Sequence, residues 1–360
     1  MKRIQLAKPK IGIREKTAVL RVLQSGNLAQ GPEVKKFESH FSKLVEEREC
    51  VAVNSGTSAL HLALLSLGVG PGDEVIVPSF TFAATANSVA LTGAKPVFVD
   101  IDPSTFNIDP AQITSAITAR TKAIQVVHLY GLPAKMDSIQ VIAKRHNLLI
   151  IEDAAQAHMA QIDGQPVGTF GDAAAFSFYP TKNMTAGEGG MVVLKESAVA
   201  RLCRLYRNQG MEQKYQNEVV GFNYRMTDIH AAIGIQQLKK LGFWTEQRIQ
   251  NAEYLSRQID SSETPVTPNG YKHVFHQYTV TLTQNRDLIS KYLDQKGISN
   301  GVYYPTPVHA LPSFDLNLEL PNTREACETA LSLPIHPSLS RADLKRIART
   351  LEEARSFHAK

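Results

Sequence analysis

The sequence predicts an α/β protein with a large, mixed but mostly parallel sheet and a smaller α+β domain at its C-terminal end. Two observations lead to this class. Short apolar runs without clean alternation are separated by helical patterns, which is typical of a sheet covered on both faces. After about residue 245 the pattern changes, which predicts two domains over residues 1–245 and 246–360.

The elements of the larger domain follow in strand–helix order. The stretch VAVNSGTSALHLALLSL predicts a strand, a turn and a helix that begins near Thr57. A later helix is indicated by Ile139, Ile142 and Ala143, which share one helical face. Further strands are expected at 74–80, 95–102, 123–131, 147–157, 173–180 and 189–195, with a helix at 81–93. The smaller domain is expected to hold a strand at 275–282, a helix at 286–297 and a last helix from Arg341.

The composition is that of an ordinary globular enzyme, with 43% hydrophobic and 20% charged residues. The net charge of +5 comes from scattered basic residues, so nucleic-acid binding is not predicted. Three cysteines, Cys50, Cys203 and Cys327, form no disulfide framework and favour the reduced cytoplasm. No run approaches the roughly 18 apolar residues of a membrane span, and the N-terminus lacks the apolar core of a signal peptide.

The segment NSGTSAL, residues 54–60, indicates an anion site. Gly56 permits a tight turn, and Thr57 opens a helix whose free N–H groups favour negative charge. A phosphate group suits this arrangement. The alternative is a plain helix cap, and the segment lacks the pattern of a P-loop.

The segment LLIIEDAAQA places Asp153 directly after an apolar strand. A carboxylate buried there needs a partner, such as a protonated ring nitrogen or a metal ion. A helix cap or a salt bridge is the alternative. Gln156, three residues further on, is expected to reach the same site.

The segment FSFYPTKNMTAGEGG places Lys182 after another apolar strand, with Ser177 on the other side of the turn. Burial would favour the neutral amine, which can attack a carbonyl and form a Schiff base. The nearby glycines would let the backbone pass close to a ligand. The alternative is an exposed lysine at a turn. A fourth segment, GFNYRMTDIHAAIG, holds Asn223 and Arg225 before a helix and is uninformative alone.

Together these strand ends supply a phosphate cradle, a carboxylate for a ring nitrogen and a lysine amine. Pyridoxal 5'-phosphate is the cofactor that needs all three. A metal-dependent enzyme has little support, because the histidines show no ligand spacing with an acidic partner. We therefore predict pyridoxal phosphate as the cofactor and no metal site.

These motifs resemble the DegT family of pyridoxal-phosphate-dependent sugar aminotransferases. The resemblance extends from SGNLAQGPEVKKFE to YYPTPVHALPSF and includes PSFTFAAT and the segments above, in the family's order. It implies the aminotransferase fold, with the cofactor in the larger domain. It also implies that Lys182 forms the Schiff base and moves the proton, that Asp153 pairs with the pyridine nitrogen and that Gln156 bonds the phenolic oxygen. Phe82 would stack on the pyridine ring, with a core aromatic as the alternative.

The resemblance further implies a homodimer with shared active sites. Gly56, Thr57 and Ser177 would hold the phosphate, together with Asn223 of the partner subunit. The residues implied to face the substrate are Tyr179, Arg225, Tyr304 and His309.

Two positions bear on how far the resemblance carries. A branch of the family has histidine in place of the lysine and removes a hydroxyl, and Lys182 argues against that branch. Met159 stands where a glycine is common, so it is expected to reshape the region near the cofactor.

The predicted function is transfer of an amino group from an amino acid, expected to be glutamate, to the keto group of a nucleotide-linked sugar. Two alternatives remain open at this point. One keeps the cofactor and takes a keto-cyclitol as acceptor. The other is a non-catalytic regulator that uses the same fold to bind a ligand or a partner, and the complete set of cofactor groups speaks against it.

Overall fold

The centre of the molecule is a seven-stranded sheet with the order β1-β9-β8-β5-β4-β2-β3. The computed structural model describes residues 2–260 and 262–358. Only β9 runs against its neighbours, so the sheet is mixed and mostly parallel, which confirms the predicted fold class. The strands are β1 (Glu49–Val53), β2 (Glu74–Pro78), β3 (Lys95–Val99), β4 (Thr121–Val127), β5 (Leu149–Asp153), β8 (Ala173–Ser177) and β9 (Gly190–Leu194).

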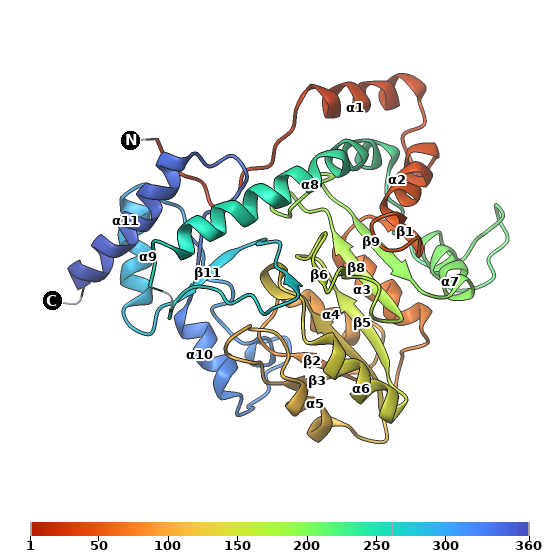
Figure 1. The fold of residues 1–360 in the computed structure, drawn as a ribbon. Helices are drawn as coiled ribbons and strands as arrows, with labels where there is room; N and C mark the ends of the chain where they lie inside the picture. Colours follow the sequence, from red (N-terminus) through yellow and green to blue (C-terminus); the bar gives the residue numbers. More distant parts are fainter. Residues whose placement is uncertain (1, 261, 359–360) are drawn as a thin grey trace.

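Helices cover both faces of this sheet (Figure 1). Along β1, Val51 and Val53 enter one core cluster while Cys50 and Ala52 enter another, because successive side chains of a strand point to opposite faces. The first cluster includes α3 (Gly56–Ser66), α4 (Ala84–Leu91) and α7 (Ser197–Arg207). The opposite face packs against α2 (Pro32–Ser42), α5 (Pro110–Ala116), α6 (Met136–His146) and the first half of α8 (Asp228–Ser256).

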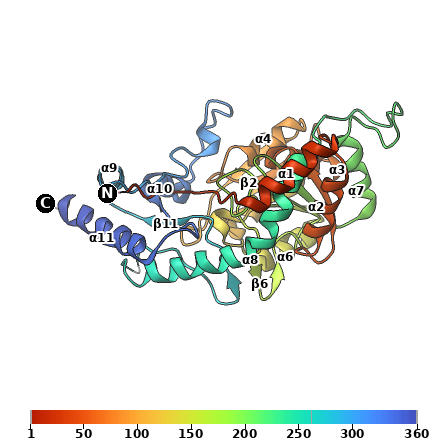
Figure 2. The same ribbon diagram turned by 90° about the horizontal axis from the view of Figure 1, so that it is seen from above.

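A second lobe surrounds the end of α8. It contains β11 (Tyr278–Thr281), β12 (Ala330–Leu333), α9 (Arg286–Gln295), α10 (Pro321–Thr329) and α11 (Arg341–His358). Its core also takes in Ile4 from the other end of the chain. Figure 2 shows the N-terminal segment passing from this lobe back to α1 (Ile13–Ser25), beside α8. Because α8 continues through residue 245 without a break, the division of the chain at that residue stays a prediction.

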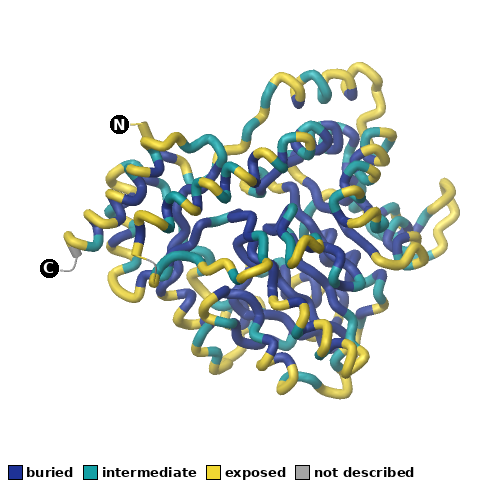
Figure 3. The backbone as a smooth tube through the Cα atoms, viewed as in Figure 1, coloured by how far each residue is buried: buried dark blue, intermediate teal, exposed yellow. Residues whose placement is uncertain are grey.

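Short elements complete the described chain. A three-stranded ribbon joins β6 (Gln161–Ile162), β7 (Gln165–Pro166) and β10 (Tyr271–Lys272), and two 3-10 turns cover Leu129–Gly131 and Val308–Ala310. Figure 3 shows the buried strands at the centre and an exposed loop between α7 and α8. Within the described ranges, no helix has the length and apolar character needed to cross a membrane.

Candidate active site

One large cavity lies beyond the carboxyl ends of the strands, between the sheet and the C-terminal lobe. Its volume is about 760 Å³. Open α/β sheets place their ligands at this edge. Nine of the predicted site residues line it: Gly56, Thr57, Phe82, Asp153, Gln156, Ser177, Tyr179, Lys182 and Tyr304.

Lys182 follows β8 in a tight turn, in which its N–H donates to the carbonyl of Tyr179 at 2.9 Å. Its side chain lines the cavity. Burial lowers the pKa of the amine to about 8, and the nearby carboxylate of Asp153 opposes part of that shift. About one tenth of this amine is therefore neutral, and thus nucleophilic, at pH 7, far more than for an ordinary lysine.

Asp153 ends β5 and is buried, with 6% of its surface exposed. Its Oδ2 accepts a hydrogen bond from the Thr85 hydroxyl at 2.8 Å, and its Oδ1 accepts one from the Ala155 N–H at 3.2 Å. Burial raises the pKa of this carboxyl, and the two hydrogen bonds with the charge of Lys182 counter only part of that effect. A cation next to Asp153 would stabilise the ionised form, so the site suits a protonated ring nitrogen.

Gln156 has a fixed orientation in the cavity wall. Its Oε1 accepts a hydrogen bond from the N–H of Tyr130 at 2.7 Å, and its Nε2 donates to the hydroxyl of Tyr304 at 3.1 Å. An amide nitrogen has two protons, so one remains for a ligand oxygen. Burial raises the pKa of Tyr304, which therefore stays a neutral phenol.

The start of α3 meets β8 in the wall of the cavity. Ser55 caps the helix by accepting from the N–H of Ser58 at 3.1 Å, which leaves the N–H groups of Gly56 and Thr57 for another acceptor. A Cβ atom on Gly56 would lie 2.7 Å from Cβ of Ser177. Only glycine allows this approach, which brings the helix terminus beside the Ser177 hydroxyl and forms a cradle for an anion.

Phe82 is not a core aromatic. It is 59% exposed and lines the cavity, where its ring centroid lies 6.1 Å from that of Tyr304. Tyr179 is 48% exposed and lines the same cavity. Both rings are thus available to a ligand.

Three predicted residues lie away from the cavity of their own chain. His309 is buried, with its Nδ1 2.6 Å from the Ser79 hydroxyl, and it does not line the cavity, so its contact with a substrate stays a prediction. Asn223 pairs through its backbone with Asn208, and the guanidinium of Arg225 donates to the side chain of Asn208 at 3.0 Å.

Met159 was expected to reshape the region near the cofactor, and the structure places it elsewhere. It adopts a left-handed conformation, with φ of 67°, and packs against the core cluster that the sheet forms with α2 and α8. A Cβ atom on Gly242 of α8 would lie 3.9 Å from its terminal methyl. Its bulk therefore fills space beside α8 and not in the cavity.

The structure adds residues that the sequence reasoning missed. Thr81, Glu188 and His276 line the cavity, and Thr85 holds Asp153. Burial, together with the charge of Lys182, holds the pKa of His276 well below its usual range, so this ring is neutral.

Taken as a whole, the fold and this cavity are those of a pyridoxal-phosphate-dependent aminotransferase. Within the described residues, no group of three or more histidine, cysteine, aspartate or glutamate side chains gathers in a way that could hold a metal ion. The chemistry of the cavity depends on the lysine amine, the buried carboxylate and the anion cradle.

Comparisons with known proteins agree with this class. A family model, the DegT/DnrJ/EryC1/StrS aminotransferase family, matches residues 9–352, and the chain belongs to this family. The chain is 44% identical over 342 residues to a pleiotropic regulatory protein of Geobacillus stearothermophilus, with 92% of each chain covered. It is 42% identical over 371 residues to the GDP-perosamine synthase of Caulobacter vibrioides, with 98% of each covered. The crystal structure of S. venezuelae DesV with a ketimine intermediate matches at a TM-score of 0.95 and 39% identity, with 98% of each chain covered.

Proposed function

We propose that this protein transfers an amino group from an amino acid, expected to be glutamate, to the keto group of a nucleotide-linked sugar, with pyridoxal phosphate as cofactor. The observation that carries the proposal is the single cavity shared by Lys182, Asp153 and the Gly56–Ser177 cradle. Membership of the aminotransferase family supports the reaction, and a relative named for a GDP-linked sugar supports the acceptor class.

The residues present fit the cofactor. The N–H groups of Gly56 and Thr57, with the Ser177 hydroxyl, would hold its phosphate, and Asp153 would hold its ring nitrogen. The second proton of Gln156 Nε2 would serve its phenolic oxygen. When bound, pyridoxal phosphate draws electrons away from the carbon that carries the amino group.

The side chains around the cofactor have distinct tasks. Lys182, with a pKa of about 8, can give up and take back a proton near neutral pH, which is what a general acid–base in amine transfer needs. Asp153 keeps a negative charge beside the ring nitrogen, and Thr85 fixes the orientation of that carboxylate. The exposed ring of Phe82 would cover one face of the cofactor.

The cavity is large enough for an acceptor as well as the cofactor. At about 760 Å³ it lies in the upper part of the usual range for ligand sites. The exposed Tyr179 and the carboxylate of Glu188 add an aromatic surface and a hydrogen-bond acceptor to its wall. Both suit a hydroxylated ring.

A homodimer with shared active sites is part of the proposal, as is a cytoplasmic location. Asn223 does not line the cavity of its own chain, so a second copy would have to bring it to the phosphate. Exposed apolar residues along α1, Ile13, Leu20 and Leu23, offer a surface for such a contact. Figure 1 shows α1 and the loop after α7 at the edges of the molecule.

Mixing two inactive variants tests the shared site. If Asn223 acts in the partner's site, Lys182→Ala and Asn223→Ala proteins, unfolded and refolded together, should regain about one quarter of wild-type activity through hybrid dimers. Each protein refolded alone is the control. No gain on mixing would contradict the shared site and leave the transamination itself untouched.

The reaction is tested with purified protein, pyridoxal phosphate, glutamate and a panel of keto-sugar nucleotides. The expected result is 2-oxoglutarate and an aminosugar nucleotide in equal amounts, measured by mass spectrometry. Equal rates with keto-cyclitols would favour the cyclitol alternative. A protein that binds cofactor but forms no 2-oxoglutarate with any acceptor would favour the regulator, which the relative named as a regulatory protein keeps open.

A further inference from the structure

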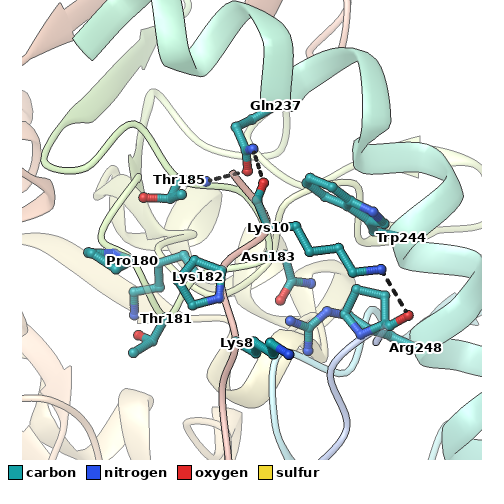
Figure 4. Close-up of a pocket in the computed structure, with 12 residues that line it drawn as sticks. Lys8, Lys10, Pro180, Thr181, Lys182, Asn183, Thr185, Gln237, Trp244 and Arg248 are labelled. Atoms are coloured by element: carbon teal, nitrogen blue, oxygen red, sulfur yellow. Dashed lines mark hydrogen bonds between the residues drawn. The ribbon is translucent and has the colours of Figure 1, made fainter. Parts of the chain in front are cut away.

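A second, much smaller cavity lies beside Lys182 and is surrounded by positive charge. Figure 4 shows its lining, with Trp244 and Arg248 from α8, and with Lys8 and Lys10 from the N-terminal segment. Lys182 is the remaining cation, and none of the lining residues is acidic. The cavity therefore concentrates positive charge without a carboxylate of its own.

Arg248 is the buried member of this group. It is 6% exposed, and its Nη1 donates to the carbonyls of Phe275 at 3.0 Å and His276 at 3.3 Å. These carbonyls bring no net charge. Its Nε has no hydrogen-bond partner, and among the ion pairs of the described residues none includes Arg248. Arginine keeps its charge in proteins, so this buried cation lacks a counter-charge.

Glu15, which contacts the wall residue Gln237, is already engaged. Glu15 binds Lys240 and accepts from Gln237 Nε2 at 2.7 Å and from the Gly12 N–H at 2.9 Å. Gln237 is itself part of the cavity wall. Within the cavity, the ammonium of Lys10 reaches only the carbonyl of Pro337, at 3.4 Å. The charge of the buried Arg248 is therefore left to be balanced from inside the cavity, and the half-buried Lys10 adds a second cation to its wall.

We propose that this cavity binds a small monovalent anion, the size of chloride, between Arg248, Lys8 and Lys10. Its volume of about 20 Å³ suits a particle of roughly the size of one water molecule. A halide and the carboxylate of a molecule as small as formate share the required chemistry.

The proposed anion site is close enough to Lys182 to influence the reaction. Thr181 and Lys182 line both cavities, so the loop 180–185 forms a wall between them. An anion on one side of that wall would favour the protonated form of Lys182 and would hold α8 and the N-terminal segment together. The inference stands on the small cavity alone and does not depend on which acceptor the enzyme uses.

The anion is located directly with bromide. Crystals of the cofactor-loaded protein grown in sodium bromide should show an anomalous peak beside the Arg248 guanidinium, and crystals grown in formate should show planar density if a carboxylate is taken instead. Absence of both would overturn the proposal. A peak only at surface lysines outside this cavity would overturn it as well.

Melting temperature gives the matched test in solution. Replacing gluconate by bromide at constant ionic strength should raise the Tm of the loaded protein by about 2 °C and then saturate. The same rise is expected in Lys122→Gln, which changes an exposed lysine on β4. The response should fall at least threefold in Lys8→Gln and be lost in Arg248→Gln. If Arg248→Gln does not fold, Arg248→Met takes its place, because it keeps an apolar stem to pack in the wall and also removes the charge. An unchanged bromide response in Lys8→Gln and in the Arg248 variant would show that the ion binds elsewhere.

Discussion

Glu152 and Asp153 are adjacent on β5, yet the protein treats their carboxylates in opposite ways. Glu152 is completely buried and accepts backbone N–H groups from Gly168, Phe170 and Gly171 at 2.8–2.9 Å. His128 Nε2 lies 3.0 Å from Oε2 of Glu152. The N–H of Ala134 donates to His128 Nδ1, so Nδ1 is an acceptor and the ring proton is on Nε2, where it is donated to Glu152. Every side of this carboxylate is occupied by the fold.

Asp153 points to the other face of the sheet, because side chains alternate along a strand. Among the described residues, the Thr85 hydroxyl and one N–H group are its hydrogen-bond donors. Burial raises its pKa, and the cavity in front of it is open to a ligand. We infer from this contrast that Asp153 keeps hydrogen-bonding capacity for a ligand, whereas the capacity of Glu152 is used by the fold.

The largest effect is expected from replacing Lys182, whose amine lies near the carboxylate of Asp153. Lys182→Ala removes the amine that we propose as nucleophile and proton carrier, so transamination should fall by about 10³-fold or more. Steady-state 2-oxoglutarate formation measures it. The control is Lys122→Ala, an exposed lysine on β4, which should keep wild-type rates. Turnover by Lys182→Ala at a similar rate would sink the proposed mechanism.

Asp153→Asn is expected to lower activity and to leave stability nearly unchanged, which would distinguish Asp153 from Glu152. The amide keeps the shape of the side chain and loses the charge that would face the ring nitrogen, so activity should fall by roughly 10²-fold or more. The thermal midpoint should change little, because the amide oxygen can accept from the Ala155 N–H while the amide nitrogen donates to the Thr85 hydroxyl, which can turn its own proton to Thr81. Circular dichroism melting and kinetics on the same preparation check both parts. A large loss of stability with normal kcat would place Asp153 in the same category as Glu152.

The lowered pKa of Lys182 can be observed without turnover. With a pKa of about 8, its amine at pH 7 should react with acetic anhydride about 100-fold faster than a lysine with the ordinary value near 10.5. The reactive fraction should rise with pH and level off above pH 8, since the neutral form then dominates. Competitive labelling of the cofactor-free protein, read by peptide mass spectrometry, gives both. A Lys182 curve that still rises at pH 10 would contradict the burial effect.

Glu152→Gln is the counterpart of Asp153→Asn and should act on stability. An amide nitrogen would face N–H donors that now point at carboxylate oxygens, and at least one donor would lose its acceptor. The cost of such a change is about 2–4 kcal/mol. Urea unfolding of the loaded protein measures it, and kcat at 25 °C should stay within about threefold of wild type. The reverse pattern, normal unfolding with a large loss of kcat, would remove the basis of the comparison.

The sequence predicted which strand ends meet at the carboxyl edge of the sheet better than it predicted the hydrogen bonds of the residues there. Apolar runs that end in Asp153 and Ser177 predicted that these side chains would meet, because carboxyl ends of parallel strands share an edge. The pairing of His128 with Glu152 depends on the register of β4 against β5, where Val127 lies beside Asp153. No local pattern encodes that register.

Other features depend on contacts distant in sequence. Phe82 resembles any core aromatic until the C-terminal segment brings Tyr304 beside it. The contact of the His309 ring with Ser79, which follows β2, also joins residues far apart in the sequence, and no local pattern predicts it. The composition changes near residue 245 because the core that α8 joins changes there, while the helix itself continues.

The smallest expected effect concerns the hydrogen bond that the Thr85 hydroxyl donates to Asp153. Thr85→Val removes the hydroxyl donor 2.8 Å from Oδ2 and keeps the shape of the side chain. The pKa of Asp153 should then rise further, because that donor stabilises the ionised form, and activity should fall by about three- to tenfold. The loss should be greatest at low pH, where the carboxyl is more easily protonated, and should shrink as pH rises. Thr85→Ser keeps the hydroxyl and should retain the wild-type pH profile of kcat/KM. Equal, pH-independent losses in both variants would mean that Thr85 supports α4 by packing, and that Asp153 depends on the cofactor side of the cavity alone.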